Sequence, residues 1–231
     1  MSTFSDAKTY ADLMLIFDNL SVQLDASRRA LRPMPDLDAR QVALRGMQEV
    51  LAGYAFGFSS MVYDRTQEQI IRSFGRTNVP PNEARRMVED AWKNGLLVLF
   101  MFKVDVLLQN LLKAEGSYSR AIGAYGTMVA RLIALSMPSD PVKTRDVLLT
   151  AGALRNSHHN NGMHRGDSRA LDIHDMHFVL VKDQAIDCAS WQHVLAILSA
   201  VVEELDRMLA SAVIAALPSP IPDAYALNPV A

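Results

Sequence analysis

Residues 151–166, AGALRNSHHNNGMHRG, hold the side chains whose types and spacing are best suited to chemistry in this sequence. Three of the six histidines fall within seven residues there, shortly after an adjacent arginine and asparagine. Arginine is a permanent cation whose planar fork suits phosphate oxygens, and histidine can exchange a proton near neutral pH. The stretch therefore has three interpretations: a metal site, a centre that cleaves nucleic acid, or the polar end of a core helix.

The residues around this stretch predict a helix from 141 to about 159 or 160. Asp140 followed by Pro141 is typical of an N-cap and a first helical residue. Asn161-Gly162 is typical of a helix end. The arginine and the first two histidines then lie in the last two turns of this helix.

At about 100° per residue, Arg155 and His159 lie one turn apart beside the buried face of this helix, and His158 lies within that face. Gly152 has no side chain and allows a close approach on the same side. A cation that holds a phosphate, with an acid or base one turn away, is a workable minimum for metal-free phosphodiester cleavage. In RNA the neighbouring 2′-hydroxyl is the nucleophile. The alternative is an exposed helix end, where cations favour the negative pole of the dipole.

Residues 154–162, LRNSHHNNG, resemble the signature of the HEPN superfamily, small all-helical domains of RNases and of toxin–antitoxin and phage-defence systems. Arg155-Asn156 matches that signature, and so does the position on the penultimate long helix. The signature places its histidine after four to six intervening residues, whereas three separate Arg155 from His159 here. Two residues separate Arg155 from His158, and eight separate it from His164. An Arg-Asn-x-x-His-x-Asn-Gly version matches the chain with His159.

The resemblance implies metal-independent RNA cleavage without a cofactor, in a homodimer whose two Arg/His pairs face one another. Carried over, it implies that Arg155 stabilises the phosphate, His159 acts as base or acid, and Asn156 orients one of them. It also implies RNA as a partner and a cognate antitoxin or regulatory protein as another. The spacing keeps a second interpretation open, a non-catalytic HEPN-like domain that binds RNA or protein. The remaining candidate binding residues are neighbours of the motif: His158, Asn160, His164 and Arg165.

A metal site is the sharpest competing interpretation. The imidazole and carboxylate ligands are numerous enough for zinc: His158, His159, His164, His174, Asp175 and His177. However, His174 and His177 lie in a β-like or loop stretch, where side chains three residues apart point to opposite faces. The chain has no Glu-x-x-His or His-Glu-x-x-His motif. We therefore assign no residue to a metal.

An interaction protein is a third class. The last helix has a broad apolar face that favours either dimerisation or, as we prefer, an ordinary core: Val194, Leu195, Leu198, Val201, Val202, Leu205 and Leu209. Nucleophilic catalysis by the single cysteine has little support, because Cys188 and His193 fall on different helix faces.

Composition favours a soluble, intracellular protein. Half of the 231 residues are apolar, which suffices for a core, and the single Cys188 favours a reducing compartment. The first residues do not resemble a signal peptide. The most apolar run, 96–112, is interrupted by charges and falls short of the about 20 apolar residues that span a bilayer. We expect no membrane partner and a cytoplasmic location.

The charge is unevenly distributed. The net charge of −2 gives no overall attraction to nucleic acid. Residues 117–169 nevertheless hold seven basic and three acidic side chains, a local excess of four positive charges. This basic segment favours a phosphate-bearing partner, although a solvated loop would show the same excess.

Helical periodicity dominates the chain and predicts one all-α HEPN-like domain over 1–216, a helical bundle. A strand-like run at 177–181 and the polar turn at 182–184 predict a small hairpin between the last two long helices. The Pro-rich tail, 217–231, is expected to be disordered or ordered only by contact. The other expected helices span about 6–31, 38–75, 82–115, 119–136 and 189–216.

Overall fold

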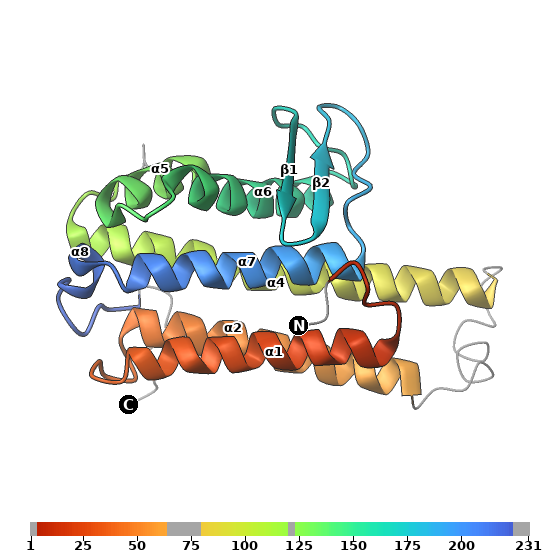
Figure 1. Ribbon diagram of the computed structural model, residues 1–231, viewed down its shortest axis with the longest axis horizontal. Coiled ribbons are helices and arrows are strands. Elements are labelled where there is room, and N and C mark those ends of the chain that lie inside the picture. The colour runs from red at the N-terminus through yellow and green to blue at the C-terminus, as the bar shows by residue number, and fades with distance from the viewer. Residues whose placement is uncertain (1–3, 64–79, 120–122, 224–231) are drawn as a thin grey trace.

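The computed structural model describes residues 4–63, 80–119 and 123–223. It confirms an all-α bundle with one small β-hairpin (Figure 1). The elements are α1 (Tyr10–Ala30), α2 (Ala39–Tyr63), α4 (Pro81–Glu115), α5 (Tyr125–Ser136), α6 (Pro141–His159), β1 (Arg169–Ile173), β2 (Met176–Leu180), α7 (Trp191–Leu209) and α8 (Ala212–Ala215).

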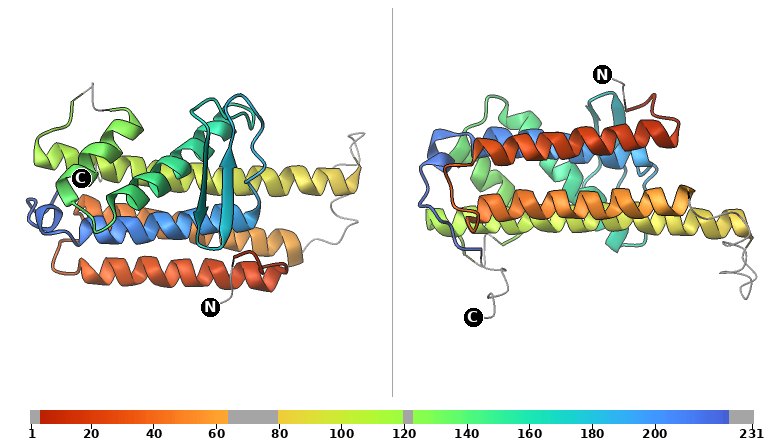
Figure 2. Two further views of the ribbon diagram at one scale, coloured as in Figure 1. Left: turned by 45° about the horizontal axis from the view of Figure 1, so that its top comes forward. Right: turned by 90° about the horizontal axis from the view of Figure 1, so that it is seen from below.

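The helices form three layers that follow the chain's apolar faces. α1 lies beside α2, α4 and α7 fill the middle, and α5 and α6 cover the opposite side (Figures 1 and 2). The predicted apolar face of α7 lies inside this chain, with Leu195, Leu198 and Val201 fully buried. This apolar face of α7 is therefore part of the protein's own core, because the neighbouring helix layers remove it from water.

Several predicted boundaries are confirmed and others are wrong. The first helix begins at Tyr10 and not near residue 6, and α7 ends at Leu209 instead of continuing to about 216. Asp140 caps α6 by accepting a hydrogen bond from the Lys143 N–H at 2.9 Å, and Ser190 caps α7. The helix expected from about 119 begins only at Tyr125, because the preceding Ala124 has an extended backbone. Residues 120–122 and the expected continuation of α2 over 64–75 lie outside the described residues.

The hairpin exists, but the position of its turn was wrong. β1 and β2 pair antiparallel, with Ile173 opposite Met176, so the turn is His174-Asp175 and not residues 182–184. The partner strand lies before the strand-like run because Leu171 and Ile173 alternate with polar residues and turn their apolar side inward. The hairpin packs against α7 and stands beside the end of α6 (Figure 1).

Among the residues that the structure describes, one helical segment, 86–115 of α4, is long and apolar enough by length and composition to cross a membrane. Most of the apolar part of this segment is buried inside the structure. A core helix of a soluble protein meets the same description, so this finding is weak evidence for a membrane span.

A buried ion pair fastens the C-terminal segment to the start of α2. Asp38 and Arg40 have fully buried side chains 2.8 Å apart. Asp38 also accepts hydrogen bonds from the Ile221 N–H at 3.1 Å and the Ser219 hydroxyl at 3.0 Å. Burial alone would raise the pKa of Asp38, but the hydrogen bonds from Arg40 and Ile221 outweigh it and lower that pKa. This part of the tail is ordered by contact.

We predict that Asp38→Asn lowers the free energy of unfolding by about 3–5 kcal/mol, because it leaves the Arg40 charge buried without a counter-ion. Urea denaturation measures the loss. The matched control is Asp25→Asn, which breaks a surface pair with Arg29 and should cost less than about 1 kcal/mol. Equal losses in the two variants would contradict this account of the buried pair.

Candidate functional site at the end of α6

The C-terminal end of α6 is shaped by a left-handed turn. The helix ends at His159, and Asn161 and Gly162 follow with φ of 57° and 78°. The Gly162 N–H donates to the Ser157 carbonyl at 2.8 Å, and the same carbonyl accepts from the Asn160 N–H at 3.0 Å, a bonding pattern typical of a helix end. The predicted helix end is confirmed, and the chain turns back beside α6 toward the hairpin.

Arg155 is held by residues from three helices. Its Nη1 donates to Oδ2 of Asp105 on α4, and the two form an ion pair. Its guanidinium carbon lies 5.2 Å from the centroid of the Tyr125 ring on α5, a cation–π contact. Its Nε donates to Oδ1 of the adjacent Asn156 at 3.3 Å. The guanidinium therefore has one defined orientation, and Asp105 offsets much of its charge.

The partners of Arg155 are themselves constrained. Burial raises the pKa of Asp105, and the nearby Arg155 cation only partly offsets this effect. The Tyr125 hydroxyl donates to the Leu148 carbonyl at 3.1 Å, and burial raises the pKa of that phenol. Tyr125 is therefore a neutral platform that positions the arginine.

Gly152 makes room for this platform. A Cβ at residue 152 would lie 2.6 Å from Cε1 of Tyr125, closer than real side chains approach. The ring thus lies against the bare backbone of α6, as the position of the glycine predicts.

The two adjacent histidines differ in environment. His159 is exposed, whereas His158 is half-buried and its Nε2 has no hydrogen-bond partner among the described residues. Burial, followed by the nearby Lys93 cation, lowers the pKa of His158. The predicted buried face of α6 is confirmed at Val147 and Leu154, but Ser157 is more buried there than His158.

The role of Ser157 was not predicted from the sequence. Its hydroxyl donates to the Ala153 carbonyl at 2.8 Å and lies 3.3 Å from Nδ1 of His164. His164 is only 3% exposed, and its Nε2 lies 3.0 Å from the Asp167 carbonyl. His164 therefore anchors the segment after α6 onto the helix, a contact that no periodic pattern predicts.

A pocket of about 400 Å³ lies beside the motif. It is bounded by the start of α5, one side of α6 and residues 164–169. Of the candidate residues, the pocket is lined by Asn156, Asn160, His164 and Arg165. Arg155, His158 and His159 are not among its lining residues. Arg169, one of the seven basic residues of 117–169, also lines it.

The pocket has partly apolar walls, with polar and positively charged side chains among its lining residues. Asn156, Asn160 and Arg165 are exposed, so their amide and guanidinium groups are accessible to a ligand. Arg165 pairs with Asp183 at 2.8 Å, and both side chains remain largely exposed, which makes the pair weak in water. No aspartate or glutamate lines this pocket. Its donors suit the oxygens of an anion such as phosphate.

The histidines outside the motif have other partners. His177 Nδ1 lies 2.6 Å from Oδ1 of Asp172, and His174 Nε2 lies 3.7 Å from Oε1 of Glu203. Asp175 accepts hydrogen bonds from the backbone N–H groups of Phe4 and Ser5. Within the described part of the chain, no three histidines, cysteines or acidic residues cluster as metal ligands.

Comparisons of this chain with protein-family models, with curated proteins and with solved structures found no match.

We predict that Gly152→Ala lowers the free energy of unfolding by up to about 2 kcal/mol. Overpacking against Tyr125 costs about 1–3 kcal/mol and outweighs the helix propensity of alanine, about 1 kcal/mol. Gly53→Ala is the matched control in α2, because a Cβ there meets nothing within 4 Å. It should stabilise the protein in the same urea titration. Stabilisation by both variants would show that Tyr125 does not need the space.

We also predict that His158 contributes acid sensitivity. Its pKa is lowered in the folded state, so below about pH 6.5 the unfolded chain binds a proton that the folded chain excludes. Stability is therefore lost as pH falls from about 6.5 through the folded pKa. In urea titrations at pH 7 and pH 5, His158→Gln should lose less stability than the wild type. Equal losses in His158→Gln and the wild type would contradict this account of His158.

Proposed function

We propose that this chain is an RNA-binding, HEPN-like helical protein that holds RNA phosphates at the end of α6. The observation that carries the proposal is the pocket beside the motif, which combines Asn156, Asn160 and Arg165 without an acidic lining residue. The local basic excess over 117–169 supports a phosphate-bearing ligand. The resemblance of residues 154–162 to the HEPN signature supports RNA as the source of the phosphate.

Binding is better supported than cleavage by the geometry of Arg155. A catalytic arginine must neutralise charge that develops on the phosphate, and here Asp105 already offsets the guanidinium charge. Neither Arg155 nor His159 is among the residues that line the pocket beside the motif. We assign Arg155 the role of positioning Asn156, whose Oδ1 it holds at 3.3 Å.

Metal-independent RNA cleavage is the second candidate function. The exposed His159, one turn from the oriented Arg155, is the observation that favours it. A homodimer that brings a second Arg155/His159 pair opposite the first would complete such a site. A cognate antitoxin or regulatory protein would then control it.

The test of binding is fluorescence anisotropy with a labelled single-stranded RNA. We predict saturable binding that weakens with salt and weakens about tenfold or more in an Asn156→Ala/Arg165→Gln double variant, because two donors to phosphate are lost. Arg131→Gln, an exposed arginine of α5 outside the pocket, is the matched control and should bind as the wild type does. Absence of wild-type binding, or equal binding by the double variant, overturns the proposal.

Cleavage is tested on the same RNA with a chelator present. If the second candidate is correct, His159→Ala abolishes cleavage, and so does Asp105→Asn/Arg155→Gln, which removes both charges of the ion pair together. The double change avoids leaving Asp105 without its counter-ion. Light scattering on the same samples reports the assembly. Unchanged cleavage in both folded variants rules out this pair as the source of activity.

A further inference from the structure

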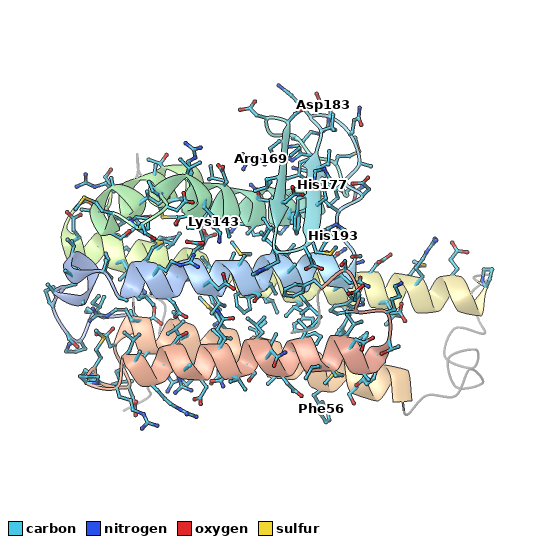
Figure 3. The ribbon with its side chains drawn as sticks, viewed as in Figure 1. Phe56, Lys143, Arg169, His177, Asp183 and His193 are labelled. Atoms are coloured by element: carbon cyan, nitrogen blue, oxygen red, sulfur yellow. The ribbon has the colours of Figure 1, made fainter. Side chains whose placement is uncertain are left out.

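A second pocket, of about 470 Å³, lies next to the first along α6. Its walls are the middle of α6 and residues 168–171, where the chain enters β1. Leu149 and Arg169 line both pockets, so the two are adjacent. Figure 3 labels Arg169 beside β1. None of the motif residues lines this second pocket.

Thr150 is the unusual residue of this pocket. It is fully buried, lines the pocket, and its Oγ1 has no hydrogen-bond partner among the described residues. A threonine in a helix commonly donates to the carbonyl four residues earlier, as Thr144 does to Asp140 at 2.9 Å. A buried hydroxyl without a partner is costly. Thr150 thus offers a donor to a ligand in the pocket.

Arg169 supplies a cation to the same place. Its Nε is buried and, within the described residues, has no hydrogen-bond acceptor. Arg145 and Asp146 also line the pocket and pair with each other at 3.2 Å. Their charges cancel, so Arg169 gives the pocket a net positive charge. Ser168 completes the lining, and its Oγ accepts from the Lys182 N–H at 2.9 Å, which leaves its own O–H free to donate.

We infer that this second pocket binds a phosphate group, which accepts hydrogen bonds from Thr150, Ser168 and Arg169. Phosphate oxygens accept several donors at once, and a guanidinium beside a buried hydroxyl satisfies two groups that otherwise have no acceptor. A phosphate here and one in the first pocket would be neighbours on either side of Arg169. The inference rests on the proposed function in taking RNA as the source of the phosphate, and a mononucleotide is the other source of the same chemistry.

The first experiment titrates the protein with inorganic phosphate and with a nucleoside 5′-monophosphate by NMR chemical-shift perturbation. Wild-type protein should show saturable shifts, and Arg169→Gln and Thr150→Val should each weaken binding about tenfold. Arg131→Gln and Thr150→Ser, which keeps the hydroxyl, should bind as the wild type does. Thr150→Val also removes an unpaired buried hydroxyl, so it should raise the Tm by about 2–4 °C. Weaker binding in a more stable protein excludes a folding defect.

The second experiment repeats the RNA anisotropy with the same variants. If RNA is the source, Arg169→Gln and Thr150→Val also weaken RNA binding. Another outcome is that RNA binds and both variants bind RNA and phosphate as tightly as the wild type does. The second pocket is then not a phosphate site, while the proposed function stands. If phosphate binding depends on Thr150 and Arg169 but RNA does not bind, the pocket takes a mononucleotide and the proposed function fails. Wild-type protein that binds neither inorganic phosphate nor the monophosphate overturns the inference.

Discussion

The ion pair between Asp105 and Arg155, closed on one side by the Tyr125 ring, joins the three helices that surround the candidate site. Asp105 is on the central α4, Arg155 on α6 and Tyr125 on α5, so one contact fixes how α5 and α6 lie on the core. The arrangement has a consequence for chemistry. Because both charges are partly buried, separating them is costly, and the guanidinium keeps its orientation whether or not a ligand is present.

The residues of the motif have two different roles, one in packing and one at the surface of the pocket. Arg155 and the buried Ser157 face helices and the returning chain, and they give the site its shape. Asn156 and Asn160 lie on the exposed side and line the pocket, where a ligand can reach them. Neighbouring positions on a helix point about 100° apart, so a short polar motif at a helix end necessarily contributes to both the core and the surface.

Local signals predicted much of the fold. The N-cap residue Asp140 and the helix-ending Asn161-Gly162 predicted both ends of α6 to within a residue. The helical spacing of apolar residues in α7 predicted which of its faces is buried. The contacts that build the site could not be predicted in this way. Asp105 and Arg155 are 50 residues apart, and the Ser157–His164 contact depends on a left-handed turn whose direction no periodicity encodes. The sequence likewise predicted a hairpin, but not which flanking segment pairs with residues 176–180.

Positive charge outside the motif decides whether this site attracts a polyanion. If the arginine of the motif is neutralised by Asp105, attraction for a polyanion must come from other cations. Arg169 fits this requirement, since it lines both pockets and its buried Nε has no acceptor in the described part of the chain. A buried donor without an acceptor lowers the stability of the free protein and strengthens the complex with a ligand that supplies one. Ligand affinity here would therefore depend more on Arg169 and its neighbours than on the spacing between Arg155 and His159.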